Sequence, residues 1–277
     1  MNKKRTSGKK PSPRFAGNQK LVNAPAQQVR EALESAYYEF NRKEFLRTDP
    51  VRCLHRYSEP KDQEVVGLLA SAFAYGSAKV FCPRLDKLFA LLGAHPYQSI
   101  RGSSLEALLP ELPSYRFFRS EDVLQMLKSL RAFFDLHSSL GDFFEKTWQK
   151  DLLFGLAQLR EALYRASPPS APSYGMKYWL PSPSQGSAKR LHLFMRWMVR
   201  KDDIDLGIWN FVERKNLLIP LDTHLHSISR RFKFTTRKTA DLRAVLEITE
   251  ALKVFDPEDP IRFDFALCRI GMLQRKV

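Results

Sequence analysis

Apolar residues recur at helical spacing along most of the chain, and this pattern limits the fold more than any other feature. Residues 64–76, 120–134, 241–255 and 259–273 each carry an apolar stripe with a spacing of three or four residues. In the first segment the stripe consists of Val65, Leu68, Leu69, Ala72 and Phe73. Sustained alternation of apolar and polar residues, which would indicate strands, is hard to find. The sequence therefore predicts an all-α fold.

Several of these helices should begin at residues that suit a helix N-terminus. Ser120 is expected to cap the helix of residues 120–134, which has acidic residues in its first turn. Asp259 is expected to cap the last helix, with Pro260 at its first helical position. These caps predict where the two helices start.

The helical pattern is absent from two segments. Residues 1–20 are rich in basic and small polar residues and cannot bury a core, so we expect a disordered basic tail. Residues 166–175, with the sequence ASPPSAPSYG, have a proline spacing that no helix tolerates. We therefore expect one domain over residues 21–277, with residues 166–175 connecting its two parts.

The positive charge lies on both the tail and the domain. Eight basic residues precede the first acidic residue, Glu31, so 8 of the formal +15 charges belong to this stretch and 7 to the rest. A basic body favours a polyanionic partner, nucleic acid first, although a merely solubilising surface would show the same charge. We expect double-stranded DNA as the partner of a monomeric protein.

The three cysteines, Cys53, Cys82 and Cys268, are far apart in the sequence. They form no CxxC pair and no four-cysteine cluster, so cysteine encodes neither a structural zinc site nor an iron–sulfur cluster. We expect no metal and no cofactor. Free thiols fit a reducing compartment, and no apolar run could act as a signal segment or cross a membrane. We therefore expect a cytoplasmic protein without a membrane partner.

The segment DTHLH, residues 222–226, allows two interpretations. Two histidines at i and i+2 converge on one metal ion when they lie on a strand, but on a helix they point about 200° apart. Leucine, isoleucine and phenylalanine recur at helical spacing here, so we expect a helix that starts at Asp222 or Thr223. Asp222 is then an ordinary N-cap, or a carboxylate with a further chemical role.

The residues around Asp222 suit that further role. The apolar run LLIP precedes it and can remove water from the carboxylate, while Arg230 and Arg231 follow two turns later and could contact phosphates. A carboxylate that faces a basic surface can stabilise the positive charge that develops on a sugar during glycosidic cleavage.

The segment IPLDTHLHSISRRFKF is similar to the aspartate-containing signature of the helix-hairpin-helix base-excision DNA glycosylases, the endonuclease-three-like superfamily. The resemblance implies a two-lobed all-α fold in which Asp222 is the essential carboxylate. Residues 180–194, LPSPSQGSAKRLHLF, resemble the hairpin of that superfamily. There the resemblance places Lys189 near the Schiff-base lysine and implies DNA contacts from Gly186 and Arg190.

A weaker likeness concerns residues 65–93, which resemble the early helix of the same superfamily. The C-terminal turn of that helix inserts polar residues into the opened DNA stack, so the resemblance implies DNA contacts from Tyr75 and Ser77. Together the three likenesses imply base-excision repair by cleavage of an N-glycosidic bond, with possible lyase chemistry at Lys189.

The sequence also departs from this superfamily. Ser182, Pro183, Ser184 and Gln185 stand where two turn glycines are expected, and residues 199–209 form an extra turn or loop between Lys189 and Asp222. The whole pattern is most similar to an uncharacterised bacterial group of unknown function that is distantly related to these glycosylases. A non-catalytic nucleic-acid-binding protein is therefore the alternative, and a metal-dependent hydrolase with Asp222, His224 and His226 is a third possibility.

Other polar and aromatic residues receive structural interpretations. Lys189 itself could be a solvated charge or a phosphate contact. Arg196, Arg200 and Lys201 are expected to be solvated or to contact phosphates. Trp197 and Trp209 are expected in the core, and the three histidines His192, His224 and His226 are expected to make local hydrogen bonds.

Overall fold

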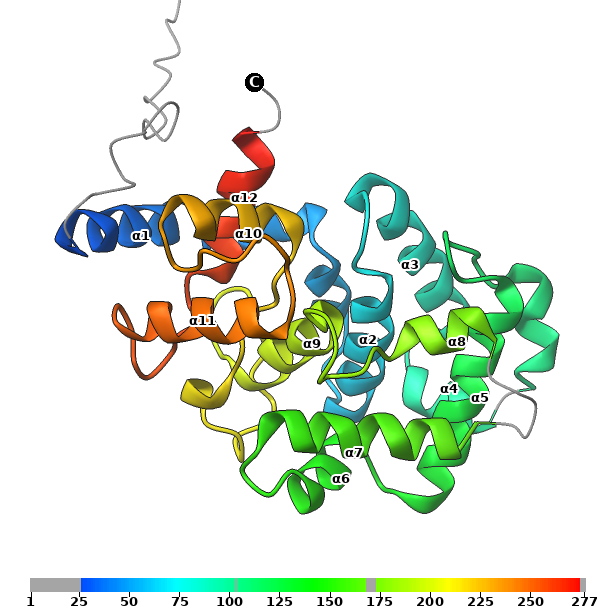
Figure 1. Cartoon of the computed structure of the whole chain (residues 1–277). Helices are drawn as coiled ribbons and strands as arrows, with labels where there is room; N and C mark the ends of the chain where they lie inside the picture. Colours follow the sequence, from blue (N-terminus) through cyan, green and yellow to red (C-terminus); the bar gives the residue numbers. More distant parts are fainter. Residues whose placement is uncertain (1–25, 103, 168–172, 275–277) are drawn as a thin grey trace, which may run out of the picture.

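The computed structural model describes residues 26–102, 104–167 and 173–274, and these residues form an all-helical protein, as the sequence predicted (Figure 1). Within these ranges there is no strand, only two isolated β-bridges that pair Tyr115 with Phe118 and Lys201 with Leu206. In the same ranges, no helix combines the length and the apolar character needed to cross a membrane. The predicted disordered tail, residues 1–20, lies outside the described residues.

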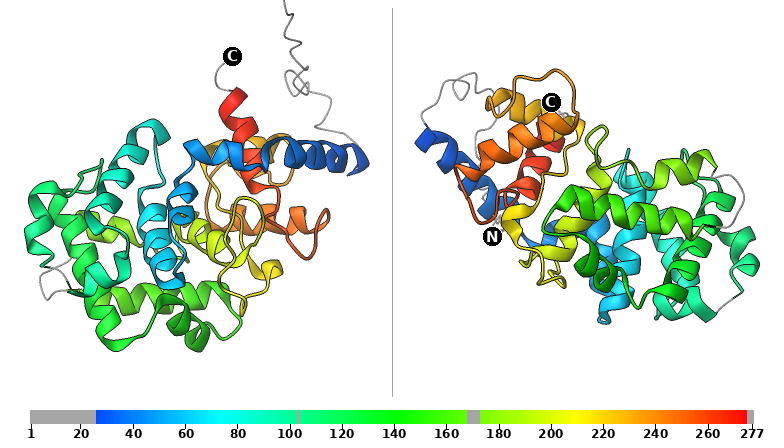
Figure 2. Two further views of the ribbon diagram at one scale, coloured as in Figure 1. Left: turned by 180° about the vertical axis from the view of Figure 1, so that it is seen from behind. Right: turned by 60° about the horizontal axis from the view of Figure 1, so that its bottom comes forward.

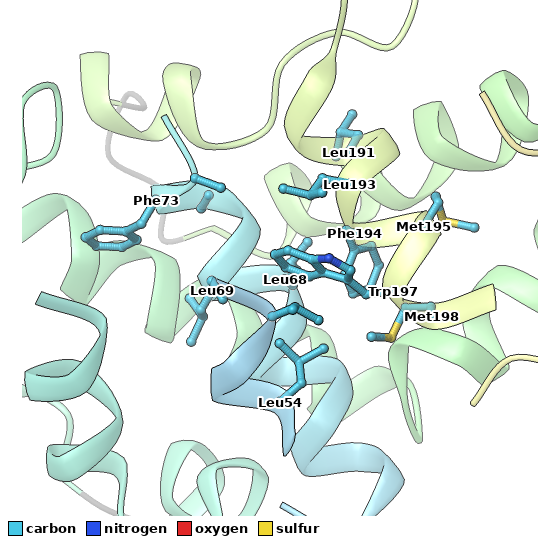
Figure 3. Close-up of a cluster of buried hydrophobic side chains, with 14 of the residues drawn as sticks. Leu54, Leu68, Leu69, Phe73, Leu191, Leu193, Phe194, Met195, Trp197 and Met198 are labelled. Atoms are coloured by element: carbon cyan, nitrogen blue, oxygen red, sulfur yellow. The ribbon is translucent and has the colours of Figure 1, made fainter. Parts of the chain in front are cut away.

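Two helices at the centre of the molecule hold the fold together. Helix α2 (Pro60–Phe73) packs along helix α9 (Lys189–Val199), and almost every residue of both is buried. Their apolar side chains interdigitate with Leu54 (Figure 3). A Cβ atom on Gly67 would lie 2.9 Å from Met198 Cε, so this glycine permits the close approach of the two helices. Trp197 is fully buried here, and Trp209 is nearly so, which confirms both as core residues.

One group of helices lies around α2, and all of its members except η3 lie between α2 and α9 in the sequence (Figure 1). Helix α5 is its longest member and contacts α4, α7 and α8. The bounds of the group are η3 (Pro50–Arg56), α3 (Ala78–Leu92), α4 (Pro96–Gly102), η4 (Glu106–Glu111), α5 (Ser120–Leu136), α6 (Leu140–Thr147), α7 (Leu152–Arg165) and α8 (Tyr174–Trp179).

A second group joins the first described helix to the last three. Helix α1 packs against α12, which also packs against α10, so residues from opposite ends of the chain lie side by side (Figure 2). The bounds of this group are α1 (Ala26–Phe40), α10 (Thr223–Arg231), α11 (Leu242–Lys253) and α12 (Asp264–Gln274). The short helices η2 (Lys43–Thr48) and η5 (Arg214–Asn216) lie in the connections.

The predicted helices exist, but two of their starts were predicted wrongly. Ser120 is the first residue of α5 and not its cap: its hydroxyl donates to Leu112 O, while Asp122 Oδ2 accepts the N–H of Arg119 at 2.7 Å. Helix α12 begins at Asp264, five residues after Asp259. Both oxygens of the Asp259 carboxylate instead accept from Arg200 Nε, each at 3.0 Å.

The proline-rich connection predicted for residues 166–175 is shorter than expected. Helix α7 ends at Arg165, and α8 already begins at Tyr174, with Ser173 as its N-cap. Residues 180–188 then link α8 to α9 and contain two positive φ angles, at Gly186 and Ala188. The loop predicted over residues 199–209 is present, but it begins at residue 200 because Val199 is still part of α9.

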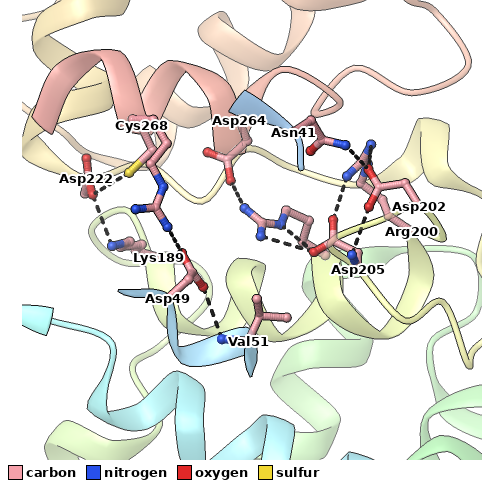
Figure 4. Close-up of polar contacts among 12 residues, drawn as sticks. Asn41, Asp49, Val51, Lys189, Arg200, Asp202, Asp205, Asp222, Asp264 and Cys268 are labelled. Atoms are coloured by element: carbon pink, nitrogen blue, oxygen red, sulfur yellow. Dashed lines mark hydrogen bonds and ion pairs between the residues drawn. The ribbon is translucent and has the colours of Figure 1, made fainter. Parts of the chain in front are cut away.

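Arg196 and Arg200 form a buried ion-pair network, so the prediction that they are solvated or contact phosphates was wrong (Figure 4). Each side chain is only 3% exposed. Lys201, in contrast, is exposed as predicted. The acidic partners come from the loop after α9, the segment before α12 and the start of α12: Asp202, Asp205, Asp259 and Asp264. The network therefore connects α9 with the second group of helices.

Candidate functional site

Lys189 and Asp222 form an ion pair, with Lys189 Nζ 3.1 Å from Asp222 Oδ2 (Figure 4). Lys189 is the first residue of α9, and Asp222 is the N-cap of α10. The two helix N-termini therefore meet although the residues are far apart in the sequence. The resemblance singled out both residues, and the structure brings them together.

The predicted cap at Asp222 is confirmed. Asp222 has an extended backbone, and its Oδ1 accepts the backbone N–H groups of His224 and Leu225, both at 2.9 Å. Leu221 before it and Leu225 after it are both buried. The cap uses only Oδ1, so Oδ2 remains directed towards Lys189.

Lys189 follows a residue in a rare backbone conformation. Ala188 has φ 42° and ψ 31°, in the left-handed region that residues with a side chain seldom adopt. Its carbonyl accepts the N–H of Leu191 at 3.0 Å and so starts α9. This turn sets the direction in which the Lys189 side chain points from the start of α9.

The pair lies partly open to solvent against α12. The side chain of Lys189 is 27% exposed and that of Asp222 is 17% exposed. Cys268 Sγ lies 4.0 Å from Asp222 Oδ2, and Asp264 stands one turn earlier on the same helix. The sequence reasoning missed both residues, although their i, i+4 spacing on a predicted helix places them on one face.

The charges of the pair stabilise each other. Burial acts to raise the pKa of Asp222, but the charge of Lys189 and the bond from Leu225 N–H outweigh it and lower that pKa below its ordinary value. Burial likewise acts to lower the pKa of Lys189, but the charge of Asp222 outweighs it, so the pKa of Lys189 is raised. At neutral pH the free protein therefore holds a carboxylate beside an ammonium group.

The residues predicted to contact DNA lie in different parts of the structure. Arg190 and Tyr75 come together, with the Arg190 guanidinium 5.5 Å from the centre of the Tyr75 ring. Gly186 and Ser77 are exposed, in the loop before α9 and at the start of α3. Arg230 and Arg231 are exposed in the last turn of α10, at the opposite end of that helix from Asp222.

The three histidines differ in their contacts. His226 Nε2 lies 3.1 Å from Arg237 O, which confirms a local hydrogen bond. His192 is fully buried, and neither of its ring nitrogens has a partner, so the predicted hydrogen bond was wrong for this residue. Burial lowers the pKa of His192 to about 4, which keeps the ring neutral.

The two histidines of DTHLH are not arranged to bind one metal ion. Because α10 is a helix, His224 and His226 point in nearly opposite directions. Among the described residues, no three histidine, cysteine or acidic side chains lie close enough together to hold a metal ion.

Comparison with known protein families identifies a family for most of the chain. Residues 49–273 match the family described as "Protein of unknown function (DUF2400)". No curated protein and no solved structure matches the chain. The matched region contains α2, α9, α10 and both members of the Lys189–Asp222 pair.

Proposed function

The chain belongs to the DUF2400 family, and for it we propose a function in DNA base excision by cleavage of an N-glycosidic bond. The observation that carries this proposal is the contact between Lys189 and Asp222 at two converging helix N-termini. A potential nucleophile and a carboxylate that can stabilise a sugar cation are thereby placed at one solvent-accessible point. The resemblance of the sequence around both residues to the glycosylase signature, and the two groups of helices, support the two-lobed glycosylase-like fold as part of the proposal.

The proposed reaction assigns one role to each member of the pair. Asp222 stabilises the positive charge that develops on the sugar as the bond between C1′ and the base lengthens. Neutral Lys189 Nζ attacks C1′, and the base leaves with the bonding electrons and takes up a proton. The C1′–O4′ bond of the sugar ring then breaks. Because Nζ gives one proton to the leaving base and a second to O4′, the opened sugar carries an imine between Nζ and C1′. Without attack by Lys189, water at C1′ would give base release alone.

A second candidate, a DNA-binding protein without catalysis, has one observation in its favour. Lys189 and Asp222 already satisfy each other as an ion pair, and the pKa of Lys189 is raised, so the resting amine is protonated and not nucleophilic. This candidate predicts DNA binding without base release.

The deciding experiment incubates the protein with a panel of lesion-bearing DNA duplexes in the presence of borohydride. Borohydride reduces an imine to a stable amine, so a covalent protein–DNA product reports attack by Lys189. We expect this product on at least one lesion, and its loss in Lys189→Ala. Duplex binding without base release and without trapping on every lesion would favour the non-catalytic candidate.

The raised pKa of Lys189 predicts how trapping depends on pH. Only the neutral amine attacks, and below its pKa the neutral fraction grows about tenfold per pH unit. We therefore expect the trapping rate to rise by roughly that factor per unit between about pH 7 and pH 9. A trapping rate that stays constant over this range would show that protonation of Lys189 in the ion pair does not limit its attack on C1′.

DNA binding should depend on both the tail and the domain. Because basic residues lie in each, deletion of residues 1–20 should weaken duplex binding without abolishing it. Affinity should also fall steeply with salt concentration as counterions are released. Titrations at several salt concentrations measure both effects. Complete loss of binding with the tail would mean that the domain has no basic DNA surface.

A further inference from the structure

Four aromatic side chains from three separate segments form an exposed cluster, which we call the aromatic platform. Tyr75 lies just after α2, Phe117 lies in the turn of residues 115–118, and Tyr174 and Tyr178 belong to α8. Tyr174 is 67% exposed and Phe117 is 39% exposed, which is unusual for large rings in a folded domain.

The rings of the platform hold one another in place. Phe117 lies 4.5 Å from Tyr178 and 5.6 Å from Tyr174, measured between ring centres. Tyr75 stacks on Phe117 at 6.0 Å with an angle of 11° between the rings, and Tyr174 stacks on Tyr178 at 6.4 Å. The platform is therefore ordered before any partner binds. Stacking on it would cost little conformational entropy of the protein side chains.

The turn that carries Phe117 is held in a rare conformation. Tyr115 and Phe118 exchange two backbone hydrogen bonds of 2.8 Å, which leaves Arg116 and Phe117 at the tip. Arg116 has φ 51°, a left-handed value that costs free energy for a residue with a side chain. Its guanidinium group lies 5.5 Å from the centre of the Tyr75 ring and 5.8 Å from that of Phe117.

A buried arginine supports the platform from the α9 side. Arg190 is only 8% exposed, and its guanidinium group lies 4.0 Å from the centre of the Tyr178 ring. Within the described part of the chain it forms no ion pair with a carboxylate, unlike Arg196 and Arg200 on the same helix. A buried guanidinium group without a carboxylate leaves positive potential beneath the rings.

The charged side chains of the two segments that carry Phe117, Tyr174 and Tyr178 have the same sign. The segments Tyr115–Arg119 and Tyr174–Trp179 contain three further basic residues, Arg116, Arg119 and Lys177, and no acidic residue. All three are exposed. Exposed rings among basic side chains suit a partner that is flat, apolar on its faces and negatively charged along one edge.

We propose that the aromatic platform binds unpaired nucleotides of a single-stranded nucleic acid. One base stacks on Tyr174 and a neighbouring base on Phe117, while the basic side chains neutralise the phosphates. Such a surface tolerates any base sequence, because every base has a face that can stack. Binding of this kind does not depend on the excision reaction at Lys189 and Asp222.

The test compares two labelled single strands of the same length, about 15 nucleotides. One is oligo-thymidine, and the other is an abasic strand that keeps the phosphates and lacks the bases. Fluorescence anisotropy with the full chain should show tighter binding of oligo-thymidine. Tyr174→Leu combined with Phe117→Leu should weaken binding of oligo-thymidine by about fivefold to a hundredfold and leave the affinity for the abasic strand nearly unchanged.

Tyr38→Leu provides the matched control. Tyr38 is also 67% exposed but lies on α1, in the second group of helices, so its loss should leave both affinities unchanged. Equal wild-type affinity for the two strands, or an equal loss for both in the platform variant, would overturn stacking. Base release from lesion duplexes is a separate measurement, so failure of the platform and failure of the excision proposal can be told apart.

Discussion

Arg200→Met should lower the free energy of unfolding by about 3–5 kcal/mol, a large part of the stability of a typical domain. Arg200 is 3% exposed, and its guanidinium group contacts three carboxylates: Asp202, Asp205 and Asp259. Methionine fills a similar volume but supplies no charge and no donor. The three carboxylates would then lie buried close together without their main cation. Their mutual repulsion and uncompensated burial cause the loss of stability.

The cost should depend on pH. Burial raises the pKa of Asp205 to about 6, although Arg196 and Arg200 act to lower it. A carboxyl group whose pKa is raised in the folded state favours folding below that pKa, and this contribution is lost as the pH rises through it. Without Arg200 the raising effect should grow. Arg200→Met should therefore be less destabilising, relative to wild type, at about pH 5 than at about pH 8.

Urea unfolding at the two pH values measures both effects, and Arg165→Met is the control. Arg165 is paired with Glu161 at 2.8 Å, but its side chain is 79% exposed. Loss of such a surface pair should cost about 1 kcal/mol or less. Equal small effects for the two arginines would contradict the view that the buried network joins α9 to the second group of helices.

The sequence predicted the helices well because periodicity is a local signal. The apolar stripe predicted in residues 259–273 is buried: Ala266, Leu267 and Ile270 lie in α12, and Phe263 lies just before it. The start of the same helix was predicted wrongly because Asp259 is an ion-pair partner of Arg200, 59 residues away. A local cap preference cannot reveal that a distant arginine occupies the carboxylate.

Local sequence signals also failed to predict the buried ion pairs of α9. In the sequence, Arg196 and Arg200 look like surface charges on a basic protein, because two of their partners, Asp259 and Asp264, come from the far end of the chain. The aromatic platform likewise arises from three segments whose rings are unremarkable one by one. Only the packing of α2, α8 and the turn of residues 115–118 brings these rings together.

The candidate site was partly predictable. Helical spacing after Leu221 was sufficient to predict the cap at Asp222, because capping is decided within four residues. The proximity of Lys189 had no local signal and was expected only through the resemblance. Cys268 was missed because a lone cysteine in an apolar stripe looks like a core residue.

Asp222→Asn should separate the cap from the proposed chemistry. Asparagine caps helices nearly as well as aspartate, and its side-chain oxygen can still accept the N–H groups of His224 and Leu225. Stability should therefore change by about 1 kcal/mol or less. The charge beside Lys189 is lost, however, and the loss of such an electrostatic contribution typically slows catalysis by about a hundredfold or more.

The chain offers a close control for this variant. Asp241 is the N-cap of α11, accepts the N–H of Ala244 at 2.9 Å and is paired with Arg237 at 2.8 Å. Asp241→Asn thus removes the same charge from the same kind of position on another helix. It should leave excision unchanged, whereas Asp222→Asn should abolish most of it.

Duplex binding completes the comparison. Removal of a negative charge from a site proposed to face DNA phosphates should keep DNA affinity the same or raise it, so the expected Asp222→Asn protein is folded, binds DNA and no longer releases the base. Single-turnover base release and thermal unfolding of the two variants measure these properties side by side. If Asp222→Asn releases the base at the wild-type rate from every accepted lesion, Asp222 serves as a helix cap alone, and the sugar cation must be stabilised elsewhere.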